Sequence, residues 1–218
     1  MTIRAVVFDM DGTIVQYPVG VHGSSWDMIF HALKLDEKYQ EFLEYYIMKH
    51  ELYGEWFEKL VALLKGGSVS DVKKLMLPPV YANKASFEET CKRLKEMGIS
   101  VGIISSGIDL VGSHVAKEFG LDFCITNKIT INGDSFDGKG ELVVNLWKKD
   151  KVLLKLCSDL NIKPKEVAVV GDYSSELPLF KIAGLGFAYS PKDDAIQKAA
   201  NHIISDFREI IPILKNHH

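Results

Sequence analysis

Two aspartates near the start of the chain have the types and spacing that chemistry requires. Asp9 and Asp11 come directly after a short apolar run and are followed by Gly12 and Thr13. A third aspartate, Asp172, follows another apolar run much later in the sequence. Carboxylates can act as nucleophiles, transfer protons and bind hard cations such as Mg²⁺. A site built from these three residues would need a cation before it could accept a negatively charged substrate.

Small polar residues and a lysine complete the set of candidates. Ser105, Ser106 and Gly107 end a second apolar run, so a hydroxyl and backbone N–H groups could face phosphoryl oxygens there. Lys149 precedes a helix-like stretch and could balance negative charge. Acidic and small residues in these positions also serve as ordinary turn and helix-capping residues, which is the alternative interpretation.

Apolar runs alternate with amphipathic stretches along much of the chain. Strands are predicted at residues 4–8, 99–105, 122–126, 166–171 and 185–189, and helices at 85–97, 109–119, 151–160, 193–200 and 206–214. This alternation is typical of an α/β protein with a doubly wound, Rossmann-like parallel sheet. In such sheets the ligand site lies beyond the carboxyl ends of the strands, where the candidate aspartates and serines occur.

Two segments interrupt the alternation. Residues 16–83 contain no convincing strand and predict helices at 24–35, 37–51, 54–65 and 70–75, so we expect an inserted helical cap domain there. The remaining residues, 1–15 and 84–218, would form the Rossmann-like core. Farther along, β-rich stretches at 128–131 and 141–147 flank a glycine-rich connection that contains Asn132-Gly133, a signal for a β-hairpin flap.

The candidates occur as four fragments in a fixed order. These are Asp9-Met-Asp-Gly-Thr13, Ser105-Ser-Gly107, Lys149, and Gly171-Asp-Tyr-Ser-Ser-Glu176. Together they resemble the four motifs of the haloacid dehalogenase (HAD) superfamily, and the layout is similar to that of the phosphoserine phosphatases. The resemblance implies a hydrolase that forms an aspartyl-phosphate intermediate and requires Mg²⁺.

The resemblance also implies roles for the individual residues. Asp9 would attack phosphorus, and Asp11 would protonate the leaving group and later activate water. The side chains of Asp9 and Asp172, with the backbone carbonyl of Asp11, would bind Mg²⁺. Phosphate would contact Gly12, Thr13, Ser105, Ser106 and Gly107.

Two of these assignments depart from a simple match. Lys149 would balance the charge of the nucleophile and the phosphate, but Lys148 and Lys151 are neighbouring alternatives. Glu176 stands where family members usually carry an aspartate, and its extra methylene can still reach Lys149 or a metal-bound water. We therefore assign Glu176 a supporting role behind the catalytic groups.

The predicted function is a magnesium-dependent phosphatase acting on a small-molecule phosphate ester. A phosphotransferase or phosphomutase using the same intermediate is one alternative, and a non-catalytic binding protein on the same fold is another. Phosphoserine phosphatases hold serine with a cap glutamate and a cap arginine, but here the first position is Pro18 and no arginine lies between Arg4 and Arg93. We therefore expect phosphoserine to be a poor substrate.

The aromatic residues of the cap allow two interpretations. Half of the chain's aromatic residues fall within the predicted cap. The first interpretation is that they fill the core of a small helical bundle, which is their commonest use. The second is that they line a pocket for a bulky or apolar leaving group.

Composition limits the partners. The 218 residues carry a formal net charge of −3, and the 26 basic residues are spread along the chain, so neither nucleic acid nor an anionic membrane is an expected partner. The sequence predicts no membrane-spanning or secretion segment, which favours a cytoplasmic protein. Cys91, Cys124 and Cys157 each lie within an apolar pattern and are expected to be buried free thiols. The oligomeric state stays open.

Overall fold

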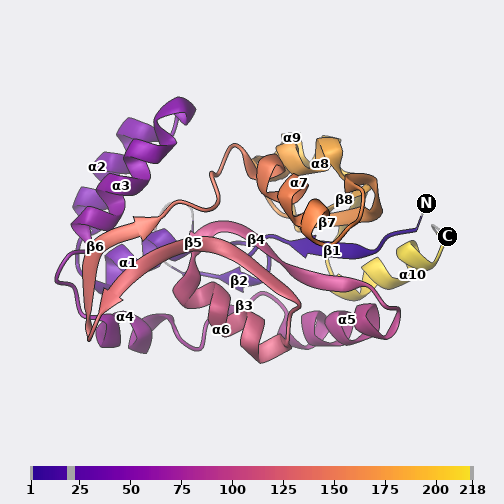
Figure 1. Ribbon diagram of the computed structural model, residues 1–218, viewed down its shortest axis with the longest axis horizontal. Helices are drawn as coiled ribbons and strands as arrows, with labels where there is room; N and C mark the ends of the chain where they lie inside the picture. The colour runs from indigo at the N-terminus through magenta and orange to yellow at the C-terminus, as the bar shows by residue number, and fades with distance from the viewer. Residues whose placement is uncertain (1, 19–22, 217–218) are drawn as a thin grey trace.

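The computed structural model describes residues 2–18 and 23–216. Within this part of the chain, a seven-stranded sheet has the order β6-β5-β4-β1-β7-β8-β9 (Figure 1). The strands are β1 (Ala5–Phe8), β4 (Ser100–Ile108), β5 (Phe123–Asn132), β6 (Ser135–Glu141), β7 (Val167–Gly171), β8 (Leu185–Tyr189) and β9 (His202–Ile204). Neighbouring strands from β5 to β9 pair in parallel, and β6 pairs with β5 in the antiparallel direction. The predicted α/β fold with a parallel sheet is confirmed.

The central strand β1 is buried on both faces because its side chains alternate between two hydrophobic clusters. Val6 and Phe8 pack with Phe87 on one side of the sheet. Ala5 and Val7 pack with residues such as Leu153 on the other side. A strand that is covered on both faces has a continuous run of apolar residues, and this is why β1 could be predicted from the sequence.

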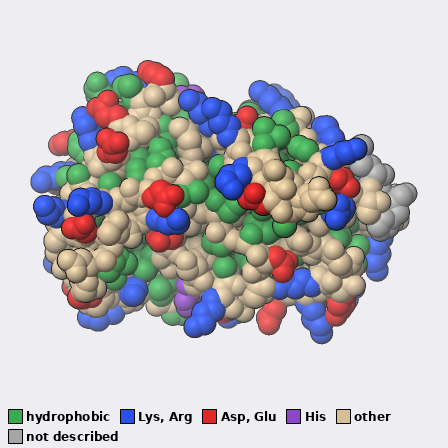
Figure 2. Space-filling model, viewed as in Figure 1, with side chains coloured by type: hydrophobic (Ala, Val, Ile, Leu, Met, Phe, Trp, Pro, Cys, Tyr) green, Lys and Arg blue, Asp and Glu red, His purple; other side chains and the backbone are tan. Residues whose placement is uncertain are grey.

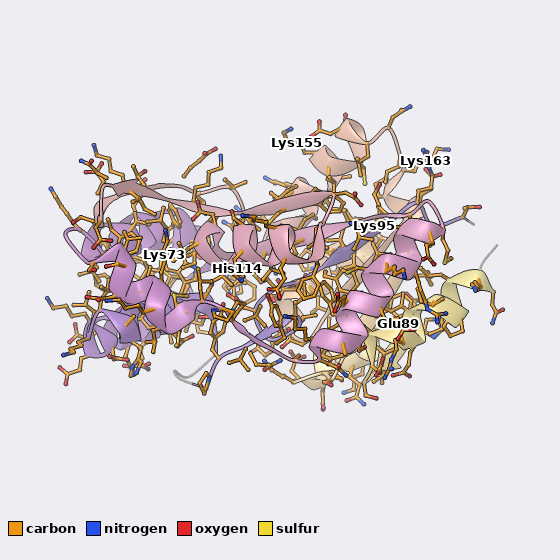
Figure 3. All side chains as sticks on the ribbon, turned by 90° about the horizontal axis from the view of Figure 1, so that it is seen from below. Lys73, Glu89, Lys95, His114, Lys155 and Lys163 are labelled. Atoms are coloured by element: carbon orange, nitrogen blue, oxygen red, sulfur yellow. The ribbon has the colours of Figure 1, made fainter. Side chains whose placement is uncertain are left out.

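Helices cover both faces of the sheet (Figure 1). Helices α5 (Lys84–Glu96), α6 (Asp109–Phe119) and α10 (Ile210–Lys215) supply residues to the cluster that contains Phe8, while α7 (Lys149–Asp159) and α8 (Leu177–Ile182) supply the other. Figure 3 shows α5, which carries Glu89 and Lys95, and α6, which carries His114, across the lower face. The remaining core helices are α9 (Asp194–Ala199) and the short 3₁₀ helices η2 (Pro164–Glu166), η3 (Ser174–Glu176) and η4 (Phe207–Glu209).

The segment between β1 and α5 is mainly helical. It contains α1 (Ser25–Ala32), α2 (Asp36–Tyr46), η1 (His50–Leu52), α3 (Tyr53–Leu63) and α4 (Val69–Met76). Ser24 and Asp27 form a capping box at the start of α1, which fixes where that helix begins. Helices α2 and α3 project beyond the sheet as a lobe (Figure 1). The division into a core and a cap at 16–83 stays a prediction, and residues 19–22 of the predicted cap lie outside the described residues.

The expectation that this segment contains no strand was wrong. A short antiparallel ribbon joins β2 (Val15–Gln16) to β3 (Val80–Tyr81). Each strand has two residues, so neither produces the period-two pattern by which strands are recognised. The ribbon brings the entry and the exit of the helical segment side by side.

The hairpin is present, but its second strand was predicted too late in the sequence. Asn132 pairs with Ser135, so the chain reverses over only two residues, and Gly133 has a φ of +62°. The glycine-rich stretch that was taken for a connection therefore forms β6 itself, and residues 142–148 lead back to α7. Strand β9 was also missed, because its three residues are too few for a clear pattern.

The hairpin is bonded to the helical segment. The backbone N–H of Gly66 donates to the carbonyl of Phe136 at 2.9 Å, and the N–H of Phe136 donates to the carbonyl of Gly67 at 3.1 Å. Asp134 in the turn accepts hydrogen bonds from the backbone and hydroxyl of Ser70, both at 2.8 Å. The hairpin and helices α3 and α4 are thus held together as one unit.

In the described part of the chain, no helix has both the length and the apolar character needed to cross a membrane. The cysteines Cys91, Cys124 and Cys157 are free thiols; Cys91 and Cys157 are buried, as predicted, whereas Cys124 is partly exposed.

Candidate active site

The parallel sheet brings the candidate residues together. Phe8 at the end of β1 pairs with Ile103 of β4 on one side and with Val170 of β7 on the other. The residues that follow these positions therefore meet at one edge of the sheet. Six predicted site residues line a single cavity of about 370 Å³: Asp9, Asp11, Ser105, Ser106, Lys149 and Asp172.

Lys149 lies between two carboxylates in the interior. Its ammonium is 3.0 Å from Oδ1 of Asp9 and also contacts Oε1 of Glu176. Burial would lower the pKa of Lys149, but the charges and hydrogen bonds of Asp9 and Glu176 outweigh it and raise that pKa above its usual value. Lys149 is therefore a permanent cation beside Asp9. Its neighbours Lys148 and Lys151 are exposed.

The glutamate at position 176 fits because the residue opposite it has no side chain. A Cβ atom on Gly171 would lie 2.3 Å from Cγ of Glu176. Glycine at the end of β7 thus leaves room for the extra methylene, and the carboxylate reaches Lys149. Oε2 of Glu176 is buried and has no hydrogen-bond partner among the described residues.

Asp11 is held by the first residue of helix α1. The backbone N–H and the hydroxyl of Ser25 donate to Oδ2 of Asp11 at 2.9 and 2.6 Å. A Cβ atom on Gly107 would lie 2.7 Å from the same oxygen, so glycine is needed where the β4 segment passes it. Oδ1 of Asp11 is buried and has no hydrogen-bond partner among the described residues, although the hydroxyl of Tyr17 is near enough to Asp11 to lower the pKa of its carboxyl.

Burial also sets the protonation of this carboxyl. It raises the pKa of Asp11 to about 7, while the hydrogen bonds from Ser25 act in the opposite direction and the charge of Asp9 adds to the rise. A large fraction of Asp11 therefore carries a proton at neutral pH. A carboxyl in that state can protonate a leaving alkoxide and, once ionised, accept a proton from water.

Asp172 has a hydrogen-bonded environment on the other side of Asp9. It accepts a hydrogen bond from the hydroxyl of Thr13 at 2.9 Å, and its Oδ2 lies 2.8 Å from the ammonium of Lys192. Burial, and then the charge of Asp9, raise the pKa of Asp172, whereas Lys192 and Thr13 lower it. Two buried carboxylates that repel each other in this way favour a bound cation.

The oxygen groups at this edge fit the predicted Mg²⁺. Gly12 has a φ of +86°, and a Cβ atom there would lie 2.3 Å from Oδ2 of Asp172. Glycine thus keeps open the space between the first motif and Asp172. Within the described residues, no group of three or more His, Cys, Asp or Glu side chains could hold a metal ion, and the predicted ligand set accordingly contains only two carboxylate side chains, Asp9 and Asp172, besides a backbone carbonyl.

The predicted phosphate-contacting residues do not all face the cavity. Ser105 and Ser106 line it, whereas Gly12, Thr13 and Gly107 do not. The N–H of Gly107 donates to the Ser105 hydroxyl at 3.2 Å, and the hydroxyl of Thr13 is used by Asp172. These three residues shape the surrounding backbone, whereas Ser105 and Ser106 line the cavity together with Asp9.

Sequence reasoning missed several polar residues of this site, among them Lys192 and Ser25. Lys192 follows the end of β8, so the rule that ligand sites lie beyond strand ends could have identified it. Ser25 contacts Asp11 from a separate helix, and its sequence neighbourhood gives no sign of that contact. Tyr17 and Pro18 lie outside any helix or strand, and the side chain of Pro18 is exposed.

Comparisons with known proteins agree with this geometry. A model of the haloacid dehalogenase-like hydrolase family matches residues 3–184. The phosphoserine phosphatase of Methanocaldococcus jannaschii is 26% identical over 215 residues, which cover 97% of this chain and 98% of that protein. The phosphoserine phosphatase of Saccharomyces cerevisiae is 30% identical over 201 residues, covering 90% of this chain and 62% of that protein.

A solved structure shares both fold and sequence with this chain. It is a phospho-aspartyl intermediate analogue of phosphoserine phosphatase, with 25% identity and a TM-score of 0.75, and the match covers 98% of this chain and 99% of that one. The region matched by the family model contains every site residue predicted from the sequence. Lys192 lies beyond that region.

Proposed function

Because the chain belongs to the haloacid dehalogenase-like hydrolase family, we propose that it is a magnesium-dependent phosphatase that hydrolyses a small-molecule phosphate monoester. The observation that carries the proposal is the arrangement around Asp9. A buried cation, Lys149, lies 3.0 Å from this carboxylate, and a carboxyl suited to proton transfer, Asp11, lines the same cavity.

In the first step, a carboxylate oxygen of Asp9 attacks phosphorus. The bond between phosphorus and the ester oxygen breaks, and Asp11 gives its proton to the departing alkoxide. Ser105 lines the cavity beside Asp9, where its hydroxyl can donate to a phosphoryl oxygen. The product of this step is an aspartyl-phosphate, which divides one difficult displacement into two easier ones.

In the second step, Asp11 is ionised and acts as a base. It accepts a proton from water, the water oxygen bonds to phosphorus, and the bond to Asp9 breaks. Phosphate leaves and Asp9 returns to its carboxylate form. Ser25 supports this cycle because its two hydrogen bonds fix Asp11 whether or not the carboxyl carries a proton on its other oxygen.

Mg²⁺ would be held by the side chains of Asp9 and Asp172 and the backbone carbonyl of Asp11. When bound, it neutralises the negative charge that phosphate and carboxylates bring together. Thr13 orients Asp172 for this task through its 2.9 Å hydrogen bond. The repulsion between Asp9 and Asp172 described above supports a cation at this place.

The helical segment 16–83 is proposed to act as a cap domain over the reaction site. It supplies Ser25 to Asp11, and its aromatic residues line the same cavity as the catalytic carboxylates. A cap in this position excludes water while the ester bond is broken. The relatives named above are phosphatases of a small phosphate ester, which supports a substrate of similar size.

The proposal is tested by measuring phosphate release from a panel of phosphate monoesters with and without Mg²⁺. We expect turnover that requires Mg²⁺ and is abolished by a chelator. Release of phosphate to water, with no transfer to added alcohols, distinguishes a phosphatase from a phosphotransferase. An absence of turnover across the panel would contradict the proposal and favour a binding protein.

A further inference from the structure

The cavity that contains Asp9 has two chemically different ends. All of its charged lining residues come from the core: Asp9, Asp11, Lys149, Asp172 and Lys192. Most of the other lining residues come from the cap. Of the described cap residues that line the cavity, none is charged. Apart from Ser24, they are aromatic or aliphatic, for example Trp26, Tyr53, Trp56 and Leu60.

The wall of the cavity is made of rings that hold one another in place. Trp26 packs edge-on against Phe57 with centroids 5.9 Å apart, and Tyr53 packs edge-on against Trp56 at 5.7 Å. The indole N–H of Trp26 donates to the backbone carbonyl of Ser106 at 3.0 Å. The apolar wall is thus fixed directly to the segment that faces the phosphate.

The apolar character continues to the rim of the cavity. Met48 lines the cavity and is 82% exposed, and Tyr173 lines it from the core side and is 43% exposed. Trp147, another lining residue, stacks on His50 with centroids 3.8 Å apart. Figure 2 shows hydrophobic side chains that extend from the α2–α3 lobe toward the part of the core that carries helices α7 to α9.

The cations in the cavity already have partners. Lys149 contacts Asp9 and Glu176, and Lys192 contacts Asp172. A substrate carboxylate placed against the cap would find no positively charged side chain there, because the described cap lining offers only uncharged polar groups, such as the hydroxyls of Ser24, Tyr39 and Tyr53. A buried charge without a charged partner is strongly disfavoured. An apolar group in the same place would gain free energy by leaving water.

From this separation we infer the substrate class: a phosphate monoester whose leaving alcohol is uncharged, apolar and at least as large as one aromatic ring. The inference rests on the proposed phosphatase function and adds its specificity. A cavity of about 370 Å³ has the size of a small-molecule site, so it accommodates a ring in addition to the phosphate. The aromatic wall, rather than a charged side chain, selects the substrate.

The test compares kcat/KM for three esters of primary alcohols at one Mg²⁺ concentration: ethyl phosphate, 2-phenylethyl phosphate and O-phosphoserine. Ethyl and 2-phenylethyl phosphate release similar alcohols, so their ratio reports binding of the ring. We expect 2-phenylethyl phosphate to exceed each of the others by about tenfold or more. A higher value for phosphoserine, or equal values for the ethyl and phenylethyl esters, overturns the inference.

Failure of the inference can be separated from failure of the proposed function. If all three esters are hydrolysed without preference for the ring, the phosphatase assignment stands and only the substrate class is wrong. If neither these three esters nor any ester of the panel above releases phosphate with Mg²⁺, the proposed function fails and the inference fails with it.

Variants of the wall provide a second test. Trp56→Leu should lower kcat/KM for 2-phenylethyl phosphate by about fivefold more than it lowers kcat/KM for ethyl phosphate. Met48→Gln, at an exposed rim position that tolerates substitution, should lower the same ratio by a smaller factor. The matched control is Tyr45→Gln, because Tyr45 is 56% exposed and does not line the cavity. Equal losses for both esters in Trp56→Leu and an unchanged ratio in Met48→Gln would contradict the assignment.

Discussion

The two ends of the cavity differ in how they are built. At the core end, each charged group has a defined partner: Lys149 with Asp9, Ser25 with Asp11, and Thr13 and Lys192 with Asp172. At the cap end, rings pack against rings. From this comparison we propose that the reaction and the choice of substrate depend on two different sets of side chains, which are joined at Ser25 and can be altered separately.

The largest effect is expected at the core end, from Asp9→Asn. The amide has the same shape but cannot act as a nucleophile, so kcat should fall about a thousandfold or more for every ester. Asp159→Asn, on the exposed surface of α7, is the control and should leave kcat unchanged. The two ends would no longer be distinct in role if Asp9→Asn changed the preference among esters and kept the rate.

Lys149→Met should reduce both activity and stability. It leaves Asp9 and Glu176 buried without their shared cation, which should cost about 3–5 kcal/mol of unfolding free energy. Denaturant unfolding measures this loss. The control Lys151→Met replaces an exposed lysine and should change stability by no more than about 0.5 kcal/mol. Adding Glu176→Leu to Lys149→Met should recover part of the stability but none of the activity.

A smaller effect is expected where the two ends join. Ser25→Ala removes one of the two hydrogen bonds that α1 gives to Asp11, so kcat should fall about tenfold, with little change in the ratio between esters. Ser70→Ala, in the same helical segment but bonded to the hairpin, is the control. A changed ester ratio with an unchanged kcat would mean that Ser25 belongs to the selecting wall and not to the reacting end.

The same comparison explains what could be predicted from the sequence. The core end was accessible because parallel pairing forces strand ends to meet, so residues as distant as Asp9 and Asp172 could be placed together from their positions after apolar runs. The choice of Lys149 over its neighbours rested on a motif. The structure adds that Lys149 alone of the three lysines is buried.

The cap end could not be resolved in this way. Its aromatic residues were interpreted first as core packing, and Trp56 is indeed 5% exposed, yet it also lines the cavity. The angle at which helices cross decides which side of a packed ring faces a cavity. A local sequence pattern does not predict that angle. For the same reason Ser25, which reaches Asp11 from another element, was missed.

The central claim is that Asp9 becomes phosphorylated during turnover, and one measurement tests it directly. Asp11→Asn should remove the base needed for the second step while an ester with a good leaving group, such as p-nitrophenyl phosphate, can still react without an acid. Mixing this variant with the phosphate-labelled ester should give one nitrophenol per protein molecule and a stable label. Mass spectrometry of the digested protein should place the label on the peptide at Asp9. Release of nitrophenol with no covalent label, or a label on another residue, would contradict the account.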